Sequence, residues 1–185
     1  MMKHYEVVAA VIEHDGKILC MQRNKGKFDY VSYKFEFPGG KVEAGEERHT
    51  ALERELREEM DMDISIPEDA YLMTVEHTYP DFAITMHAYV CKLAQPKFIM
   101  KEHVAAKWLA PADLNTLDWA AADMPIVERL LSEEKLLALL PDDGRRIRAA
   151  VFSRPPSLPP GTLTTAAAGH QSRRPRCAGP FLFPR

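Results

Sequence analysis

The stretch from Glu46 to Met60 constrains the fold more than any other part of the chain. Its apolar residues Leu52, Leu56 and Met60 recur at every fourth position, which stacks their side chains along one face of an α-helix. The segment 37–62 also holds seven glutamates. Because the apolar stripe must be buried against a second layer, the sequence predicts an amphipathic helix over 46–60 with an acidic border.

Three of these glutamates gather on one side of the expected helix. At about 100° per residue, Glu55, Glu58 and Glu59 fall within roughly 100° of arc beside the apolar stripe. Like charges at this spacing destabilise a helix by only a few tenths of a kcal/mol, so a solvated acidic face is one interpretation. The preceding pair Gly39 and Gly40 favours a metal site, because glycine lets the backbone approach a ligand and present a carbonyl. Oxygen ligands of this kind suit Mg²⁺, whose usual partner is a phosphate chain.

The rest of the body predicts a mixed sheet. Two β-rich runs joined at Asp15 and Gly16 are typical of a hairpin, because these residues tolerate positive φ. Further expected elements are a short strand over 33–40 that ends in a glycine turn, a strand pair over 70–79 and 83–93, a strand over 103–111, and a final helix that follows Asp123 and ends before Pro141. This order predicts an α+β fold, an α/β/α sandwich with a mixed central sheet between helices.

The last 45 residues differ in composition from the body. Residues 141–185 hold eight Arg, no Lys, two Asp and no Glu, a net charge of +6, whereas the whole chain carries −3. Eight of the 14 prolines also lie there. Such a segment cannot bury enough apolar surface to offset chain entropy. We therefore expect one domain over 1–140 and a Pro/Arg-rich tail over 141–185, disordered or non-native, whose binding to nucleic acid is not favoured.

Composition narrows the class of protein further. No apolar run approaches the roughly 20 residues that cross a bilayer, and the N-terminus lacks the pattern of a secretory signal. Three widely spaced cysteines suggest neither a disulfide framework nor a metal site. The sequence thus predicts a cytoplasmic protein with ordinary thiols, and it leaves the oligomeric state open.

From Gly40 onward the chain resembles a known family signature. Gly40 is followed after five residues by Glu46 and after seven more by "RELREEMDM", which is similar to the Nudix box G-x5-E-x7-R-E-U-x-E-E-x-G-U, where U is a bulky aliphatic residue. Asp61 replaces the last glycine of the box, and the other specified positions match. Because that glycine follows the helix in a left-handed conformation, which Asp visits at modest cost, we expect a slightly strained helix end.

The resemblance implies a metal site and a chemistry. It assigns ligation of Mg²⁺, with Mn²⁺ as an alternative ion, to Glu55, Glu58, Glu59 and the Gly39 carbonyl. Gly40, Glu46 and Arg54 would be structural members of the box; Arg54 lies four residues before Glu58, a spacing that allows an ion pair. Family members attack a phosphorus of a nucleoside diphosphate linkage with a metal-activated water.

Residues outside the box favour the MutT-like branch, which includes CTP pyrophosphohydrolases and 8-oxo-dGTP diphosphatases. The resemblance implies phosphate binding by Arg23 and a metal or proton-accepting role for Glu102; each could also be an ordinary surface residue. Asp123 would either contact the base or cap the final helix, and the aromatic rings of Tyr79 and Phe37 would either stack on the base or pack in the core. The sequence does not decide whether Glu55 or Glu102 is the general base.

Three histidines have no predicted functional role. His77, His87 and His103 lack a metal-ligand arrangement, so we expect surface or sheet positions for them. The leading hypothesis is a hydrolase that converts a (d)NTP, CTP-like or oxidised dGTP-like, to the (d)NMP and pyrophosphate and clears the nucleotide pool. The alternatives are a pyrophosphatase for ADP-ribose or a dinucleoside polyphosphate and, less favoured, a non-enzymatic Nudix binding module.

Overall fold

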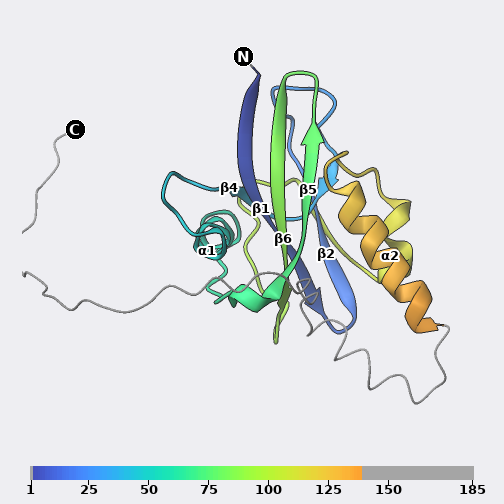
Figure 1. Cartoon of the computed structure of the whole chain (residues 1–185). Coiled ribbons are helices and arrows are strands. Elements are labelled where there is room, and N and C mark those ends of the chain that lie inside the picture. The colour runs from blue at the N-terminus through green and yellow to red at the C-terminus, as the bar shows by residue number, and fades with distance from the viewer. Residues whose placement is uncertain (1, 139–185) are drawn as a thin grey trace, which may run out of the picture. The chain divides into compact units, whose positions relative to one another are not determined.

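The computed structural model describes residues 2–138, which form a mixed β-sheet with one α-helix on each face (Figure 1). The strands are β1 (Lys3–His14), β2 (Lys17–Gln22), β3 (Phe35–Glu36), β4 (Gly39–Lys41), β5 (Tyr71–Thr78), β6 (Phe82–Lys92) and β7 (Ala105–Leu109). The helices are α1 (Arg48–Met60) and α2 (Met124–Ala138), with short 3-10 turns η1 (Glu68–Ala70) and η2 (Pro111–Thr116). The predicted α+β sandwich is confirmed.

The sheet is organised around β1. Its strand order is β3-β2-β1-β6-β5, while β4 pairs with β1 and β7 pairs with β2. β1 and β6 are parallel from the pair Lys3 and Phe82 to the pair Glu13 and Lys92. The β1–β2 hairpin turns at Asp15 and Gly16, which have φ of 49° and 75°, as the sequence predicts.

Each face of the sheet is covered by one apolar layer, because successive residues of β1 point to opposite sides. Val8, Ala10 and Ile12 pack with the α1 residues Leu52, Leu56 and Met60. On the other face, Ala9 and Val11 pack with the α2 residues Ile126, Val127 and Leu130. The period of four that predicted α1 therefore marks the face by which the helix is held to the sheet.

Two predicted boundaries differ from the structure. α1 begins at Arg48 rather than at Glu46. Gly39 and Gly40 do not form a turn, because they lie in β4 and pair with Ala9 and Val8 of β1. A strand that forms only by pairing with a distant segment leaves no local signal, which is why the sequence suggested a turn there.

The end of α1 is confirmed as predicted. Asp61 adopts the left-handed conformation, with φ 55° and ψ 34°, and its amide donates to the Arg57 carbonyl at 3.1 Å.

The residues that follow Ala138, including the expected end of the last helix and the tail, lie outside the described part of the chain. Within the described part, no helix has the length and apolar character needed to cross a membrane.

Candidate active site

The acidic border of α1 spans a range of burial. The Glu58 side chain is 62% exposed, whereas that of Glu55 is 15% exposed. Oε2 of Glu59 is buried and has no hydrogen-bond partner among the described residues. Burial, together with the nearby carboxylates of Glu102, Glu55 and Glu36, raises the pKa of Glu59 to about 7, although His103 opposes this rise.

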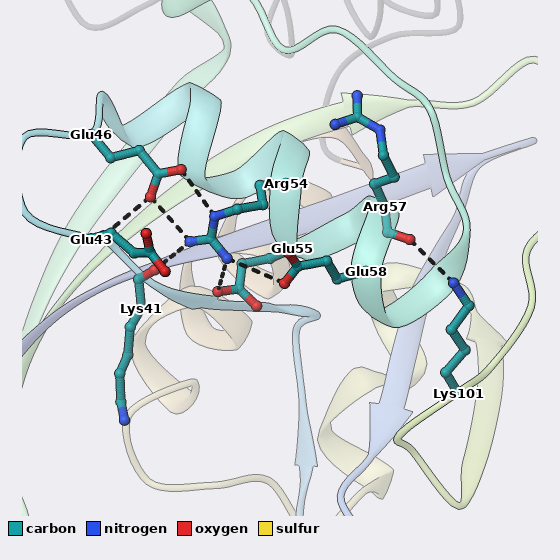
Figure 2. Close-up of polar contacts among 8 residues, drawn as sticks. All are labelled: Lys41, Glu43, Glu46, Arg54, Glu55, Arg57, Glu58 and Lys101. Atoms are coloured by element: carbon teal, nitrogen blue, oxygen red, sulfur yellow. Dashed lines mark hydrogen bonds and ion pairs between the residues drawn. The ribbon is translucent and has the colours of Figure 1, made fainter. Parts of the chain in front are cut away.

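Arg54 ties the acidic residues together (Figure 2). Its guanidinium donates to both carboxylate oxygens of Glu46 at 3.0 Å and to the Lys41 carbonyl at 3.0 Å. It also reaches Glu55 at 2.8 Å and, more weakly, Glu58 at 3.4 Å. The expected pair with Glu58 is therefore present, but the bidentate bond to Glu46 is the stronger anchor.

The glycines of β4 lie against the helix and the central strand. A Cβ on Gly40 would come within 2.2–2.5 Å of the Glu55 carboxyl group. A Cβ on Gly39 would lie 2.1 Å from the Val8 carbonyl oxygen of β1. A side chain at position 39 would therefore collide with the backbone of β1, whereas a side chain at position 40 would require the Glu55 carboxyl group to move.

A cavity of about 660 Å³ lies beside β4, on the face of the sheet that carries α2. Six of the residues singled out from the sequence line it: Arg23, Phe37, Gly39, Gly40, Tyr79 and Asp123. The carboxylates of α1 and Glu102 are not among its lining residues. The structure therefore brings the candidate base and phosphate contacts together in one cavity. The acidic helix α1 packs on the opposite face of the sheet from α2.

Aromatic rings form much of the cavity wall. Tyr79 stacks on Tyr30 with ring centroids 5.4 Å apart, and it packs against Phe82 at 4.9 Å. Phe37 is buried and packs against Trp119 at 4.8 Å. Tyr79 and Phe37 are thus parts of the core that also line the cavity.

Asp123 is a buried polar group at the start of α2. Its backbone carbonyl accepts from Ile126 and Val127, while its Oδ1 accepts from the Phe37 amide at 3.0 Å. Burial, and secondarily the Glu36 carboxylate, raises the pKa of Asp123 well above its usual range. The side chain therefore joins the start of α2 to the segment between β3 and β4, and it lines the cavity instead of capping its own helix.

Sequence reasoning missed Glu36. One oxygen of its carboxylate accepts from Arg23 at 2.6 Å and the other lies 3.0 Å from Nε2 of His103. Both contacts join residues that are far apart in the chain, and alternation within β3 gave no sign of them. Glu36 holds the guanidinium of Arg23 at the cavity wall.

The expectation for His103 was wrong. Its side chain is only 6% exposed, and it belongs to the loop between β6 and β7 rather than to the surface or to a strand. Glu102, its neighbour, is exposed on the same loop. His77 in β5 and His87 in β6 do occupy the sheet, as expected.

The donor atoms for a cation are present but separated. Within residues 2–138, no three His, Cys, Asp or Glu side chains come close enough together to hold one metal ion. Arg54 occupies the space between Glu55 and Glu58. Among the described residues, the one buried carboxylate oxygen without a hydrogen-bond partner is Oε2 of Glu59.

Comparison with known proteins shows the class to which this arrangement, an acidic helix beside a Gly-Gly strand that borders a cavity, belongs. The model of the NUDIX domain matches residues 7–129. The chain belongs to the Nudix family and is a Nudix hydrolase.

Within the family, the chain is similar to MutT-like enzymes. It is 37% identical over 131 residues to the CTP pyrophosphohydrolase of Escherichia coli K12, which covers 71% of this chain and 94% of the relative. The 8-oxo-dGTP diphosphatase of the same organism is 27% identical over 129 residues, 70% of this chain and 98% of the relative. The solution structure of the E. coli ORF135 protein, 37% identical, superposes with a TM-score of 0.60 over 71% of this chain and 91% of that chain.

Proposed function

We propose that this protein is a divalent-metal-dependent nucleoside triphosphate pyrophosphohydrolase that uses Mg²⁺, or Mn²⁺, and converts a CTP-like or oxidised dGTP-like nucleotide to the monophosphate and pyrophosphate. The observation that supports it most directly is the buried, unpartnered Oε2 of Glu59 at the acidic border of α1. A buried carboxylate oxygen without a donor is costly unless a cation or solvent contacts it.

The donor set has the chemistry that a hard divalent cation requires. Glu55, Glu58 and Glu59 offer carboxylate oxygens from one helix, and Gly39 offers a carbonyl from β4. Glu102 is the further candidate on the neighbouring loop. When bound, the ion would supply charge to offset the phosphate oxygens and would lower the pKa of a bound water.

The cavity supports recognition of a nucleotide by this chain's own residues. Arg23 would contact a phosphate with the part of its guanidinium that Glu36 does not occupy. Tyr79 and Phe37 offer aromatic faces near Asp123, whose carboxyl group can meet a polar edge of the base. A volume of about 660 Å³ lies in the range of ordinary ligand pockets.

The reaction needs one water for each nucleotide. The water oxygen forms a bond to a phosphorus, the bridging P–O bond breaks with its electron pair on the leaving phosphate oxygen, and one proton is released. The nucleoside monophosphate and pyrophosphate are the products. We assign this activity to the domain 1–140, which includes the whole match to the NUDIX domain.

The names of two relatives support the proposed choice of substrate. The E. coli relative that is 37% identical is named a CTP pyrophosphohydrolase, and the one that is 27% identical is named an 8-oxo-dGTP diphosphatase. Asp123 favours bases that carry an exocyclic amine over uracil, because a carboxylate accepts from an amine. Retention of every box carboxylate favours an enzyme over a binding module.

A nucleotide panel with Mg²⁺ tests the proposal. CTP, dCTP, 8-oxo-dGTP, UTP, ADP-ribose and a dinucleoside polyphosphate would be incubated with the full chain, and pyrophosphate and orthophosphate would be measured separately. We expect pyrophosphate from CTP or 8-oxo-dGTP and none without a divalent ion. Faster cleavage of ADP-ribose or the dinucleotide, without release of pyrophosphate, would contradict the proposed substrate class.

A further inference from the structure

Asp61 ends α1 in a way that is unfavourable for the helix itself. It is one of three residues other than glycine in the described part of the chain that have a positive φ, and glycine adopts this conformation at less cost. Its negative charge also lies at the C-terminus of the helix, where the macrodipole favours cations. A residue that is unfavourable on both counts is expected where its side chain makes a contact that glycine could not make.

The backbone at this end of the helix does not require an aspartate. The amide of Asp61 donates to the Arg57 carbonyl at 3.1 Å. The amide of Met62 donates to the Leu56 carbonyl at 3.2 Å. These two bonds form the Schellman arrangement, in which glycine usually takes the position that Asp61 has here. The feature that distinguishes Asp61 from glycine is therefore its carboxylate.

Lys101 is the partner of this carboxylate. Its Nζ lies 3.4 Å from Oδ1 of Asp61, and it belongs to the loop 93–104 between β6 and β7. The same ammonium group donates to the Arg57 carbonyl at 3.4 Å (Figure 2). Lys101 thus supplies the positive charge that the end of a helix favours and offsets the charge of Asp61. The lysine and aspartate side chains are 42% and 58% exposed, so the contribution of this pair is modest.

The backbone of the loop is also docked on the end of α1. The Ile99 amide donates to the Met60 carbonyl at 2.9 Å. The Lys101 amide donates to the Glu59 carbonyl at 3.0 Å. Both carbonyls belong to the last turn, where a helix leaves its acceptors without internal partners. The position of the loop therefore depends on how the helix ends.

Glu102 follows Lys101 directly and is exposed on the same loop. Beyond it the loop is attached again, because the Val104 amide donates to the Gln22 carbonyl of β2 at 3.0 Å. Glu102 therefore lies between an attachment to the sheet and an attachment to the end of α1. The second attachment can be weakened from Asp61 without any change in the sheet.

We propose that Asp61 is a positioning residue, whose carboxylate acts through Lys101 to hold the loop that carries Glu102 against the end of α1. The inference rests on the proposed function, because it concerns the placement of a residue that this function uses. In this role Asp61 contacts neither nucleotide nor ion. A glycine at this position would give a more favourable helix end but could not hold the lysine.

Amide hydrogen exchange measures the docking of the loop in EDTA, without nucleotide. In Asp61→Gly the amides of Ile99 and Lys101 should exchange about two- to fivefold faster than in the wild type, which is the effect of losing one exposed ion pair. The melting temperature should stay the same or rise, because glycine suits the helix end. Asp61→Asn tolerates the left-handed conformation but lacks the charge, so it should show the same faster exchange.

Asp15→Gly is the matched control. Asp15 also has a positive φ, 49°, in the β1–β2 turn, and its carboxylate lies 3.4 Å from Nε2 of the adjacent His14. This substitution should leave the exchange rates of the Ile99 and Lys101 amides unchanged. Unchanged rates of both amides in Asp61→Gly would overturn the inference whatever the activity, as would an equal acceleration in Asp15→Gly.

Kinetics test whether the loop acts through Glu102. Because misplacement of a group by about 1 Å can cost about a hundredfold, Asp61→Gly should lower kcat by at least about threefold, with KM within about twofold of the wild type. In a Glu102→Gln background the same substitution should change kcat by less than about twofold. An equal factor in both backgrounds, or a wild-type kcat in Asp61→Gly, would overturn the positioning role. If the wild type cleaves no nucleotide yet Asp61→Gly shows the faster exchange, the proposed function fails and the docking of the loop by Asp61 stands.

Discussion

Replacement of Glu59 by glutamine should stabilise the protein in the absence of divalent ions at pH 8. The pKa of Glu59 rises from 4.5 to about 7 in the folded protein, so the native state binds this proton more tightly than the unfolded state does. The stability that this proton provides is complete below about pH 4.5 and is lost as the pH rises to about 7. Above that pH the wild type holds an unfavourable buried charge that glutamine lacks.

The size of the effect follows from the pKa difference. A difference of this size corresponds to about 3 kcal/mol, and partial exposure of the side chain reduces it to about 1–2 kcal/mol. In EDTA at pH 8, Glu59→Gln should therefore melt roughly 3–6 °C above the wild type, whereas near pH 4.5 the two should melt together. Thermal unfolding followed by circular dichroism measures both.

The exposed carboxylate on the same helix provides the control. Glu58→Gln removes an equal charge from a side chain that is 62% exposed, so its melting temperature should change little. Addition of Mg²⁺ should then stabilise the wild type more than Glu59→Gln, because the variant lacks the anionic ligand. A variant that melts at or below the wild-type temperature in EDTA at pH 8 would refute the claim that this carboxylate is costly without a cation.

Three further predictions test other parts of the site. Gly40→Ala should lose most turnover while remaining folded, because its Cβ displaces the side-chain carboxyl group of Glu55. Gly39→Ala should lower the melting temperature, because its Cβ meets the backbone of β1. Enzyme assays and thermal melts of both variants check this contrast. Removal of all residues after Leu140 should leave kcat and melting temperature almost unchanged, and a large loss of stability would show that the tail packs. Asp123→Asn should change the relative kcat/KM for CTP, dGTP and UTP by about tenfold at high pH and by less at low pH, with the melting temperature within a few degrees; an unchanged ranking at every pH would leave Asp123 a structural role only.

The parts of the fold that were predictable have local signals. The period of four in α1 and the pair Asp15 and Gly16 act through neighbours in the chain, and both appear in the structure. Asp61 is a local case as well, because the geometry that ends a helix requires a left-handed residue at this point. Such features depend on propensity and spacing, which a single sequence contains.

Site residues were predictable where they form a signature of closely spaced positions. They were not predictable where contacts join segments that are distant in the chain. Glu36 and His103 are 67 positions apart, and neither has a neighbour that indicates the other. The strand β4 was missed for the same reason, because its two glycines form a strand only by pairing with the distant strand β1. Pairing and burial decide these positions, and both are properties of the folded chain.

Asp123 shows how the folded chain changes the chemistry that the sequence implies. The backbone carbonyl of Asp123 accepts hydrogen bonds from the Ile126 and Val127 amides of α2. Its side chain accepts from the Phe37 amide at 3.0 Å. Because burial raises its pKa, the protonated form is favoured to a higher pH than in solution. A protonated carboxyl group accepts through one oxygen and donates through the other, as an asparagine amide does, whereas the ionised group only accepts. Wild-type Asp123 should therefore resemble Asp123→Asn below its raised pKa and favour amino-bearing bases above it. Because every nucleotide is compared at the same pH, ratios of kcat/KM cancel the titration of phosphates and of the carboxylates of α1. Over the pH range in which none of the compared bases titrates, the dependence of those ratios on pH reports the protonation of this one side chain.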